Sequence, residues 1–463
     1  MPPRESSSNT DRVGDGSAIS KDYSTVPVRD LNSLKESEIS IEGVVYDFSN
    51  FDHPGGDSIS LFGGQDATIQ YKMIHPHHNK NTASARFAKM KTTGILPAYQ
   101  PEYTFESPFS TELKEEVFKI VKRNEQFGTF GYFFRVFCFL GIFFYFHYLW
   151  AVQGSSISLA ILYGVAAACI GTSVQHDANH GAASRRPWIN ELLGYSNDLL
   201  GNPKILWMQQ HWTHHAHTND VSRDPDSHGA EPFLLFYNYP SDSSKRRWYH
   251  KFQGFYLIAI LSGFWAALFF SLDFSTMQKS SLKPPFRTDT LYMRKTYWMT
   301  QALHVYYRIS FVLPPLIHHG LLSWKPFVHI SFFAVSVSLC LGLLFTLSHN
   351  FEGVHAGDLS EKTKSDEPTC WYSRQVETSS TYGGFISGCF TGGLNFQIEH
   401  HLFPRMSSAW YPYIAPTVRR VCAKHGVHYT HFPWIWQNMW STFQHVRKVG
   451  TGVLASPSKQ KVI

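Results

Sequence analysis

Three short clusters of histidines have the residue types and spacing that a metal centre needs. They read HDANH at 176–180, HWTHH at 211–215 and QIEHH at 397–401. Residues three or four positions apart lie on the same face of a helix, so the members of each cluster can point toward one centre. Neutral imidazole is a common protein ligand of iron, copper and zinc. The predicted metal ligands are His176, His180, His211, His214, His215, Gln397, His400 and His401.

The number of clusters strengthens the prediction. One cluster would be weak evidence because histidine is common at protein surfaces, but all three lie just outside long apolar segments. A further histidine, His349, ends another apolar segment and is expected on the same side of the membrane as a ligand. Eight imidazoles exceed the needs of one ion, so we predict two metals. Asp177 and Glu399 point away from the ligand faces by helical phase, and we expect them to orient imidazoles or to be structural.

Membrane helices must position these clusters. Apolar stretches occupy about 132–151, 156–175, 254–272, 303–322 and 327–348, each close to the roughly 20 residues that cross a bilayer. The clusters reach one side only if an even number of crossings separates them. We therefore expect two transmembrane hairpins, with the segment 254–272 lying in the interface. The predicted fold is an all-α, multi-span membrane domain of about four transmembrane helices with a cytosolic cap.

The remaining composition excludes other classes of protein. The net charge of +6 comes without a basic tract, so we expect no nucleic-acid partner. Six cysteines form no CxxC pair or regular framework, as in a reducing, cytosol-facing protein. Residues 1–23 are polar, lack the apolar core of a signal peptide and are predicted to be disordered. Trp434, Trp436 and Trp440 could anchor an amphipathic helix at the bilayer surface, but we expect them to pack over the helical domain.

The N-terminal part has the pattern of a small α+β haem-binding domain. A strand predicted at 44–48 precedes HPGG at 53–56, and a helical stretch ends at His75. The pattern resembles the cytochrome b5 domain, which implies that His53 and His75 are the axial ligands of haem b. His77 and His78 are close by, but His75 stands at the position of the family motif. The predicted boundaries are a disordered N-terminus (1–23), the haem domain (24–103), a linker (104–130), the membrane domain (131–445) and a tail (446–463).

The order of the haem domain and the three clusters resembles the cytochrome b5-fused front-end fatty acyl desaturases over residues 24–445. Gln397, DPDS at 224–227 and GGLNF at 392–396 match family signatures, and other tracts are most similar to microalgal delta-5 desaturases. The resemblance implies two non-haem iron ions, O2, and electrons delivered by NADH-cytochrome b5 reductase through the haem. The implied product is a cis double bond near the carboxyl end of a C20 polyunsaturated acyl chain. The chain would be carried on a membrane lipid or on coenzyme A.

The resemblance also implies a multi-pass protein of the endoplasmic reticulum membrane, with the haem domain and histidine clusters facing the cytosol. The lysines at 459 and 461 are spaced as in a dilysine retrieval signal. The alternatives that share this chemistry are a delta-6 acyl desaturase, a delta-8 sphingolipid desaturase and a membrane lipid hydroxylase. A membrane-anchored haem electron carrier is a non-enzyme alternative, but it leaves the nitrogen ligands without a role.

Overall fold

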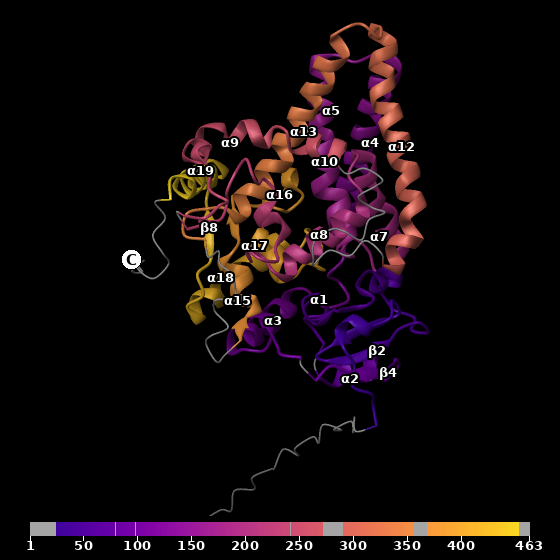
Figure 1. The fold of residues 1–463 in the computed structure, drawn as a ribbon, viewed down its shortest axis with the longest axis vertical. Coiled ribbons are helices and arrows are strands. Elements are labelled where there is room, and N and C mark those ends of the chain that lie inside the picture. Colours follow the sequence, from indigo (N-terminus) through magenta and orange to yellow (C-terminus); the bar gives the residue numbers. More distant parts are fainter. Residues whose placement is uncertain are drawn as a thin grey trace, which may run out of the picture.

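The computed structural model describes residues 25–78, 80–97, 99–240, 242–271, 290–354 and 368–452. A tall helical bundle rises from a broader helical body, and a small domain of strands and short helices lies beneath that body (Figure 1). This architecture confirms the predicted fold class. The predicted disorder of residues 1–23 and the dilysine pattern at 459–461 lie outside the described residues.

The N-terminal domain is built on a four-stranded sheet of order β3-β1-β2-β4. β1 and β2 form a hairpin whose turn residues, Glu42 and Gly43, both have positive φ, as tight two-residue turns require. The strands pack against the helices through a small core of Ile39, Ile41, Tyr46, Phe48, Ala67 and Met90. The elements are η1 (Leu31–Ser33), β1 (Glu38–Ile41), β2 (Val44–Asp47), η2 (Gly56–Phe62), β3 (Gln65–Asp66), α1 (Thr68–Ile74), α2 (Lys80–Phe87) and β4 (Lys91–Ile95).

Two helical hairpins form the tall bundle (Figure 1). The spans Phe130–Gln153, Ile157–Asn179 and Lys325–His349 are long and apolar enough to cross a membrane. A fourth helix of 29 residues, α12, runs beside them and continues down to the N-terminal domain. The bundle elements are α4 (Phe130–Tyr148), η3 (Leu149–Gln153), α5 (Ile157–Ile170), η4 (Gly171–Gln175), α12 (Leu291–His319) and α13 (Lys325–His349).

Both hairpin loops lie at the same end of the bundle. The ring of His318 contacts the carbonyl oxygen of Ala151 at 3.2 Å, and the ring of His319 contacts that of Ser155 at 3.0 Å. Each hairpin therefore starts and ends at the other end of the bundle, beside the body. This arrangement brings the segments that carry the histidine clusters to a common side.

The apolar segment at 254–272 does not form one long helix. It folds into two short helices, α9 (Gln253–Leu261) and α10 (Phe264–Ser271), on either side of Ser262 and Gly263. α10 packs against α13, where the backbone N–H of Trp265 donates to the hydroxyl of Ser338 at 2.8 Å. Neither helix has the length that a bilayer crossing requires.

The body is a cap of short elements over the lower end of the bundle. Its largest core joins α3, α8, α15, α17 and α18. Two short parallel strand pairs, β5 with β6 and β7 with β8, tie distant parts of the chain together. The cap elements are β5 (Tyr103–Thr104), α3 (Pro108–Ile120), α6 (His176–Asn179), α7 (Pro187–Gly194), η5 (Tyr195–Leu200), α8 (Lys204–Ala216), η6 (Pro225–His228), η7 (Trp248–Phe252), β6 (Thr369–Cys370), α15 (Trp371–Glu377), β7 (Ser380–Tyr382), α16 (Phe385–Thr391), α17 (Gln397–Leu402), α18 (Tyr411–His425), β8 (Thr430–Phe432) and α19 (Ile435–Thr451).

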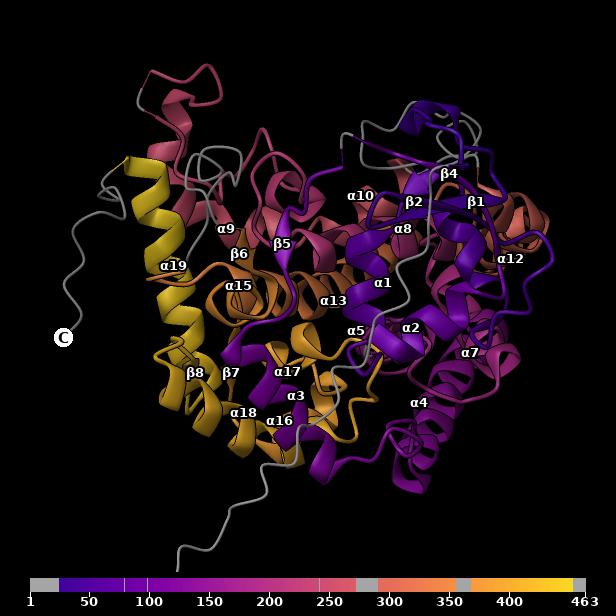
Figure 2. The ribbon, with the colours of Figure 1, turned by 90° about the horizontal axis from the view of Figure 1, so that it is seen from below.

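The N-terminal domain is packed against the cap rather than tethered to it. Leu61 and Met73 belong to the same buried cluster as Met208 and Trp212 of α8. An ion pair between Asp57 and Lys295 of α12, with N and O 3.0 Å apart, lies at the edge of the contact. Seen from below, the domain lies beside α8 and α12, while α18 and α19 lie on the opposite side of the cap (Figure 2).

One expectation about the C-terminal tryptophans is wrong. Trp434, Trp436 and Trp440 do not pack over the helical domain, because their side chains are 62%, 61% and 61% exposed. α19 is amphipathic, and it packs its opposite face on α9, where Gln253 donates to the carbonyl of Val446 at 2.7 Å. Helical phase places the tryptophans on the outward face.

The close packing of α5 on α13 yields a testable prediction. A Cβ atom at Gly164 would lie 2.7 Å from the carbonyl oxygen of Phe333, whereas a Cβ at Gly141 of α4 would meet nothing within 4 Å. Small residues let membrane helices approach closely. We expect Gly164→Val to push the two helices apart and to cost about 1–3 kcal/mol of stability. Fluorescence-detected thermal unfolding of the purified protein should show a lower Tm, and Gly141→Val should not. Equal Tm values for the two variants would contradict this account.

Candidate metal centre and haem cavity

Four helix ends bring the predicted ligands together at the base of the bundle. α6 continues from α5 through the π-helical turn η4, and α8, α17 and the last turn of α13 meet it there. π-helical turns of this kind are frequent at functional sites. None of the nine predicted ligand side chains is more than 6% exposed. Those side chains are His176, His180, His211, His214, His215, His349, Gln397, His400 and His401.

The ligand atoms fall into two adjoining groups. The ring nitrogens of the first group lie within 4.8 Å of one another, and so do those of the second. His215 forms a further set with His400 and His401, so it stands between the groups. Gln397 belongs to the second group, because its amide nitrogen is 3.0 Å from Nε2 of His349. The first group is His176, His180, His211 and His400, and the second is His214, His349 and His401.

The chemistry of this donor set fits bound metal ions. Both ring nitrogens of His180 and Nε2 of His400 are buried without a hydrogen-bond partner in the structure. An unpartnered buried polar atom costs about 1–3 kcal/mol, which a coordinate bond would offset. Burial lowers the pKa of His211, His400 and His401 well below the ordinary value, and so favours the neutral imidazole that binds metals.

Hydrogen bonds at Nδ1 turn several of these rings so that Nε2 faces the cluster. Nδ1 of His214 lies 2.9 and 3.0 Å from the two carboxylate oxygens of Asp224. Nδ1 of His401 is 2.9 Å from the side-chain oxygen of Gln375. Nδ1 of His400 is 3.1 Å from the hydroxyl of Tyr411. The backbone carbonyl of Thr378 does the same for His349, at 3.0 Å.

Asp224 contacts the predicted ligand His214, a contact that sequence reasoning missed. Burial acts to lower the pKa of His214, but the carboxylates of Asp224 and Asp226 outweigh it and raise that pKa to about 9. A more basic imidazole is a stronger ligand. The signal in the sequence was the DPDS motif, but ten residues separate Asp224 from His214, so helical spacing could not connect them.

The two acidic residues inside the clusters tie structural elements together. Asp177 accepts hydrogen bonds from the backbone N–H and hydroxyl of Ser408, both at 2.9 Å, and its other oxygen lies 3.6 Å from Nδ1 of His176. Glu399 accepts from the hydroxyl of Tyr429 at 2.7 Å and from Thr381 at 3.1 Å. Burial raises the pKa of Glu399 to about 7. Asp177 thus lies next to a ligand, whereas Glu399 connects α17 with β7 and the segment after α18.

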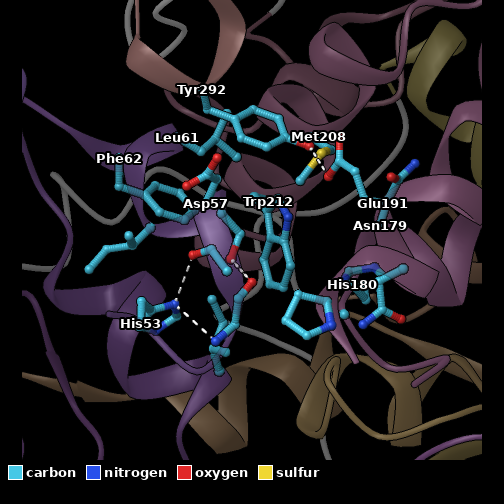
Figure 3. A pocket seen from close by; sticks show the side chains of 18 of the residues that line it. His53, Asp57, Leu61, Phe62, Asn179, His180, Glu191, Met208, Trp212 and Tyr292 are labelled. Atoms are coloured by element: carbon cyan, nitrogen blue, oxygen red, sulfur yellow. Dashed lines mark hydrogen bonds between the residues drawn. The ribbon is translucent and has the colours of Figure 1, made fainter. Parts of the chain in front are cut away.

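A cavity of about 550 Å³ lies between the N-terminal domain and the cap (Figure 3). His53 and His75 line one side of it, with ring centroids 6.3 Å apart. Nδ1 of each ring contacts the backbone, at Gly56 and Tyr71, which leaves Nε2 free for a haem iron. The size of the cavity and its two facing imidazoles fit a haem with two axial histidines.

The structure distinguishes His75 from its neighbours. Of His75, His77 and His78, His75 alone lines the cavity. Nδ1 of His78 is instead hydrogen-bonded to the hydroxyl of Tyr71, at 2.9 Å. Burial, reinforced by the guanidinium of Arg405, lowers the pKa of His53 to about 4 and that of His75 well below its ordinary value. Both imidazoles are therefore neutral at physiological pH, as axial ligands must be.

A second cavity, of about 170 Å³, begins at the other side of the histidine cluster. His211, His214, His349 and Gln397 line its inner end. The remainder is largely apolar, as a site for a hydrocarbon chain requires. The sequence did not reveal which residues line this cavity, because they come from elements far apart in the chain, among them η4, η5, α8, α9, α10, α13, α17 and α19. The principal apolar residues are Leu261, Phe264, Trp265, Leu341 and Phe345.

Asp224 provides a direct test of the metal centre. Asp224→Asn keeps the shape of the side chain but removes the charge beside His214, and we expect metal affinity to fall about 10–100-fold. The measurement is metal content by mass spectrometry after dialysis against graded chelator. Asp220→Asn is the matched control, because Asp220 is equally buried but bonds to Ser222 and Arg223. Full metal retention in Asp224→Asn would contradict the assignment, and equal loss in both variants would point to general destabilisation.

Comparison with known proteins agrees with this geometry. Residues 148–433 match the family described as fatty acid desaturase, and residues 27–108 match the cytochrome b5-like haem/steroid-binding domain. The chain is 34% identical over 427 residues to an acyl-lipid (7-3)-desaturase of Diacronema lutheri, covering 89% of this chain and 91% of the relative. It is 26% identical over 455 residues to Delta(5) fatty acid desaturase A of Dictyostelium discoideum, covering 93% and 94%. The chain therefore belongs to the fatty acid desaturase family, as an oxygen-dependent oxidoreductase with a cytochrome b5-like domain fused at its N-terminal side.

Proposed function

We propose that this protein is a front-end desaturase that introduces a cis double bond near the carboxyl end of a polyunsaturated acyl chain. One observation carries the proposal: the histidine cluster lies between two cavities. His180 lines the cavity that His53 and His75 enter, and His211 lines the apolar cavity. A metal centre held there is accessible to electrons from one side and to a hydrocarbon chain from the other.

The metal ligands in this proposal are the two groups together with His215 and Gln397, nine residues in all, and the haem ligands are His53 and His75. Two bound non-haem iron ions would activate O2 and remove hydrogen from adjacent methylenes, while a bound haem b would supply electrons singly. The chain's own residues hold and shield this chemistry. Asp224, Gln375 and Tyr411 fix the orientation of imidazoles. The apolar wall of the second cavity excludes water from the reacting carbons.

The position of the new double bond depends on how far the acyl chain enters the apolar cavity. We propose carbon 5 of a C20 acyl chain, supported by the tracts that resemble microalgal delta-5 desaturases. The relatives carry names that specify different positions, including acyl-lipid (7-3)-desaturase, acyl-lipid (8-3)-desaturase and Delta(5) fatty acid desaturase. Residues of the cavity wall rather than the shared ligands would make this distinction.

We also propose four membrane crossings, by the two hairpins α4–α5 and α12–α13, in the endoplasmic reticulum membrane. The common end of both hairpin loops supports an even number of crossings. The haem domain and the histidine cluster would then both face the cytosol, where NADH-cytochrome b5 reductase can reduce the haem. The domain boundaries at 24–103 and 131–445 remain predictions, with 104–130 as the linker.

Expression in yeast tests the reaction and its position together. Cultures fed separately with C18, C20 and C22 polyunsaturated acids should yield a new C20 product with a double bond at carbon 5, identified by gas chromatography of methyl esters. His176→Ala should lower conversion by about 100-fold or more, because it removes a ligand. The matched control is His217→Ala, since His217 is buried beside Glu102 instead of in the cluster. A product at carbon 4 or 6 would refute only the position, whereas hydroxylated or sphingolipid products would refute the proposed reaction.

The wall of the apolar cavity gives a second prediction. Leu341 of α13 lines the cavity, whereas Val335 on the same helix is 39% exposed on the outside of the bundle. Leu341→Trp should shorten the cavity and lower conversion of C20 relative to C18 acids by about tenfold. Val335→Trp should leave that ratio unchanged. The ratio in co-fed cultures is the measurement, and an unchanged ratio in Leu341→Trp would place the acyl chain elsewhere.

A further inference from the structure

One aromatic side chain lies between the haem cavity and the histidine cluster. Trp212 of α8 lines the haem cavity and is only 5% exposed. Its indole ring lies 4.7 Å from the ring of His180, centroid to centroid, and 6.4 Å from that of His215. Figure 3 shows the indole between His53 on one side and His180 on the other. One side chain thus contacts both the space for the haem and two predicted metal ligands.

We propose that Trp212 is the bridge through which electrons pass from the haem to the metal centre. This inference rests on the proposed function, in which the haem reduces the metals. Electron tunnelling weakens steeply across empty space and is better supported by closely packed atoms, and an indole supplies a continuous π-system. In each transfer, one electron leaves the haem iron and one electron enters the metal centre. Trp212 gains and loses no proton and undergoes no net change.

The packing around Trp212 supports a fixed bridge rather than a mobile side chain. Trp212 lies in the same buried cluster as Met208 and as Leu61 and Met73 of the N-terminal domain. The amide of Gln209 on the same helix donates to the backbone carbonyl of Leu61 at 3.3 Å. The haem domain is therefore held against the helix that carries the bridge, and electron transfer requires no rearrangement of the two domains.

Helix α8 carries a second tryptophan, Trp207, beside the predicted metal ligands. Trp207 also contacts the ligands, since its ring is stacked on that of His211 with centroids 4.4 Å apart. Trp207 lines the apolar cavity and not the haem cavity. α8 thus places one tryptophan on each side of the metal ligands. Only the one on the haem side is positioned to carry electrons.

The experiment follows the haem instead of the product. Full-length protein loaded with haem and iron is reduced without oxygen, then mixed in a stopped-flow instrument with O2 and a C20 acyl substrate. The loss of ferrous haem absorbance gives a rate constant, and its amplitude gives the fraction of molecules with a working metal centre. Iron-free protein supplies the rate of direct haem oxidation. The midpoint potential of the haem is measured for each variant, so that a change in driving force is not mistaken for a broken bridge.

We expect Trp212→Met, which fills the space without a ring, to slow haem oxidation by about tenfold or more, with Trp212→Phe within about threefold of the wild type. Trp371→Met is the matched control, because Trp371 lies in the same buried cluster but lines neither cavity, and it should leave this rate constant unchanged. Trp212→Leu provides a second ringless variant if the Met variant folds poorly. An unchanged rate constant in the ringless Trp212 variants, or an equal loss in Trp371→Met, would overturn the inference. If iron-loaded wild-type protein oxidises its haem no faster than iron-free protein, the proposed function is wrong, and the inference is wrong with it.

Discussion

The burial of many neutral imidazoles in one place is the constraint on which the rest of this structure depends. Imidazole nitrogens are polar, so each must have a partner when water is excluded. The chain supplies partners at Nδ1 from Asp224, Gln375, Thr378 and Tyr411, and leaves Nε2 atoms facing one another. Bound metal ions would offset the cost of the nitrogens that have no hydrogen-bond partner. The bundle, the cap and the short strand pairs all hold helix ends around it.

Predicted metal ligands line both cavities. In the proposed function, hydrocarbon would reach the metals from one cavity and electrons from the other. The apolar cavity extends from the cluster between α9, α10 and α13. The haem cavity opens on the other side, and both domains contribute its walls. The two short helices of the 254–272 segment contribute Leu261, Phe264 and Trp265 to the wall of the apolar cavity.

The haem domain is packed against the cap as well as joined to it by the chain. Leu61 and Met73 of that domain share a buried core with α8 of the cap, so the two units are packed as one body. Asp57 and Lys295 add an exposed ion pair, which contributes about 0–1 kcal/mol. Apolar burial therefore holds the domain in place, while the charges favour its orientation. The haem cavity lies beside α8, the helix that carries the predicted ligands His211, His214 and His215.

The sequence by itself determined the haem domain, the three histidine clusters and the paired hairpins, because these depend on residue type and short-range spacing. Helical periodicity predicted His176 with His180, and the resemblance to cytochrome b5 selected His53 and His75. Only the tertiary structure decided which histidines lie together, that Asp224 contacts His214, and which side chains line the apolar cavity. These contacts join residues far apart in the chain, and no local pattern encodes them. The outward face of α19 was mispredicted for the same reason: tryptophan tolerates burial and a lipid interface equally, so packing alone makes the choice.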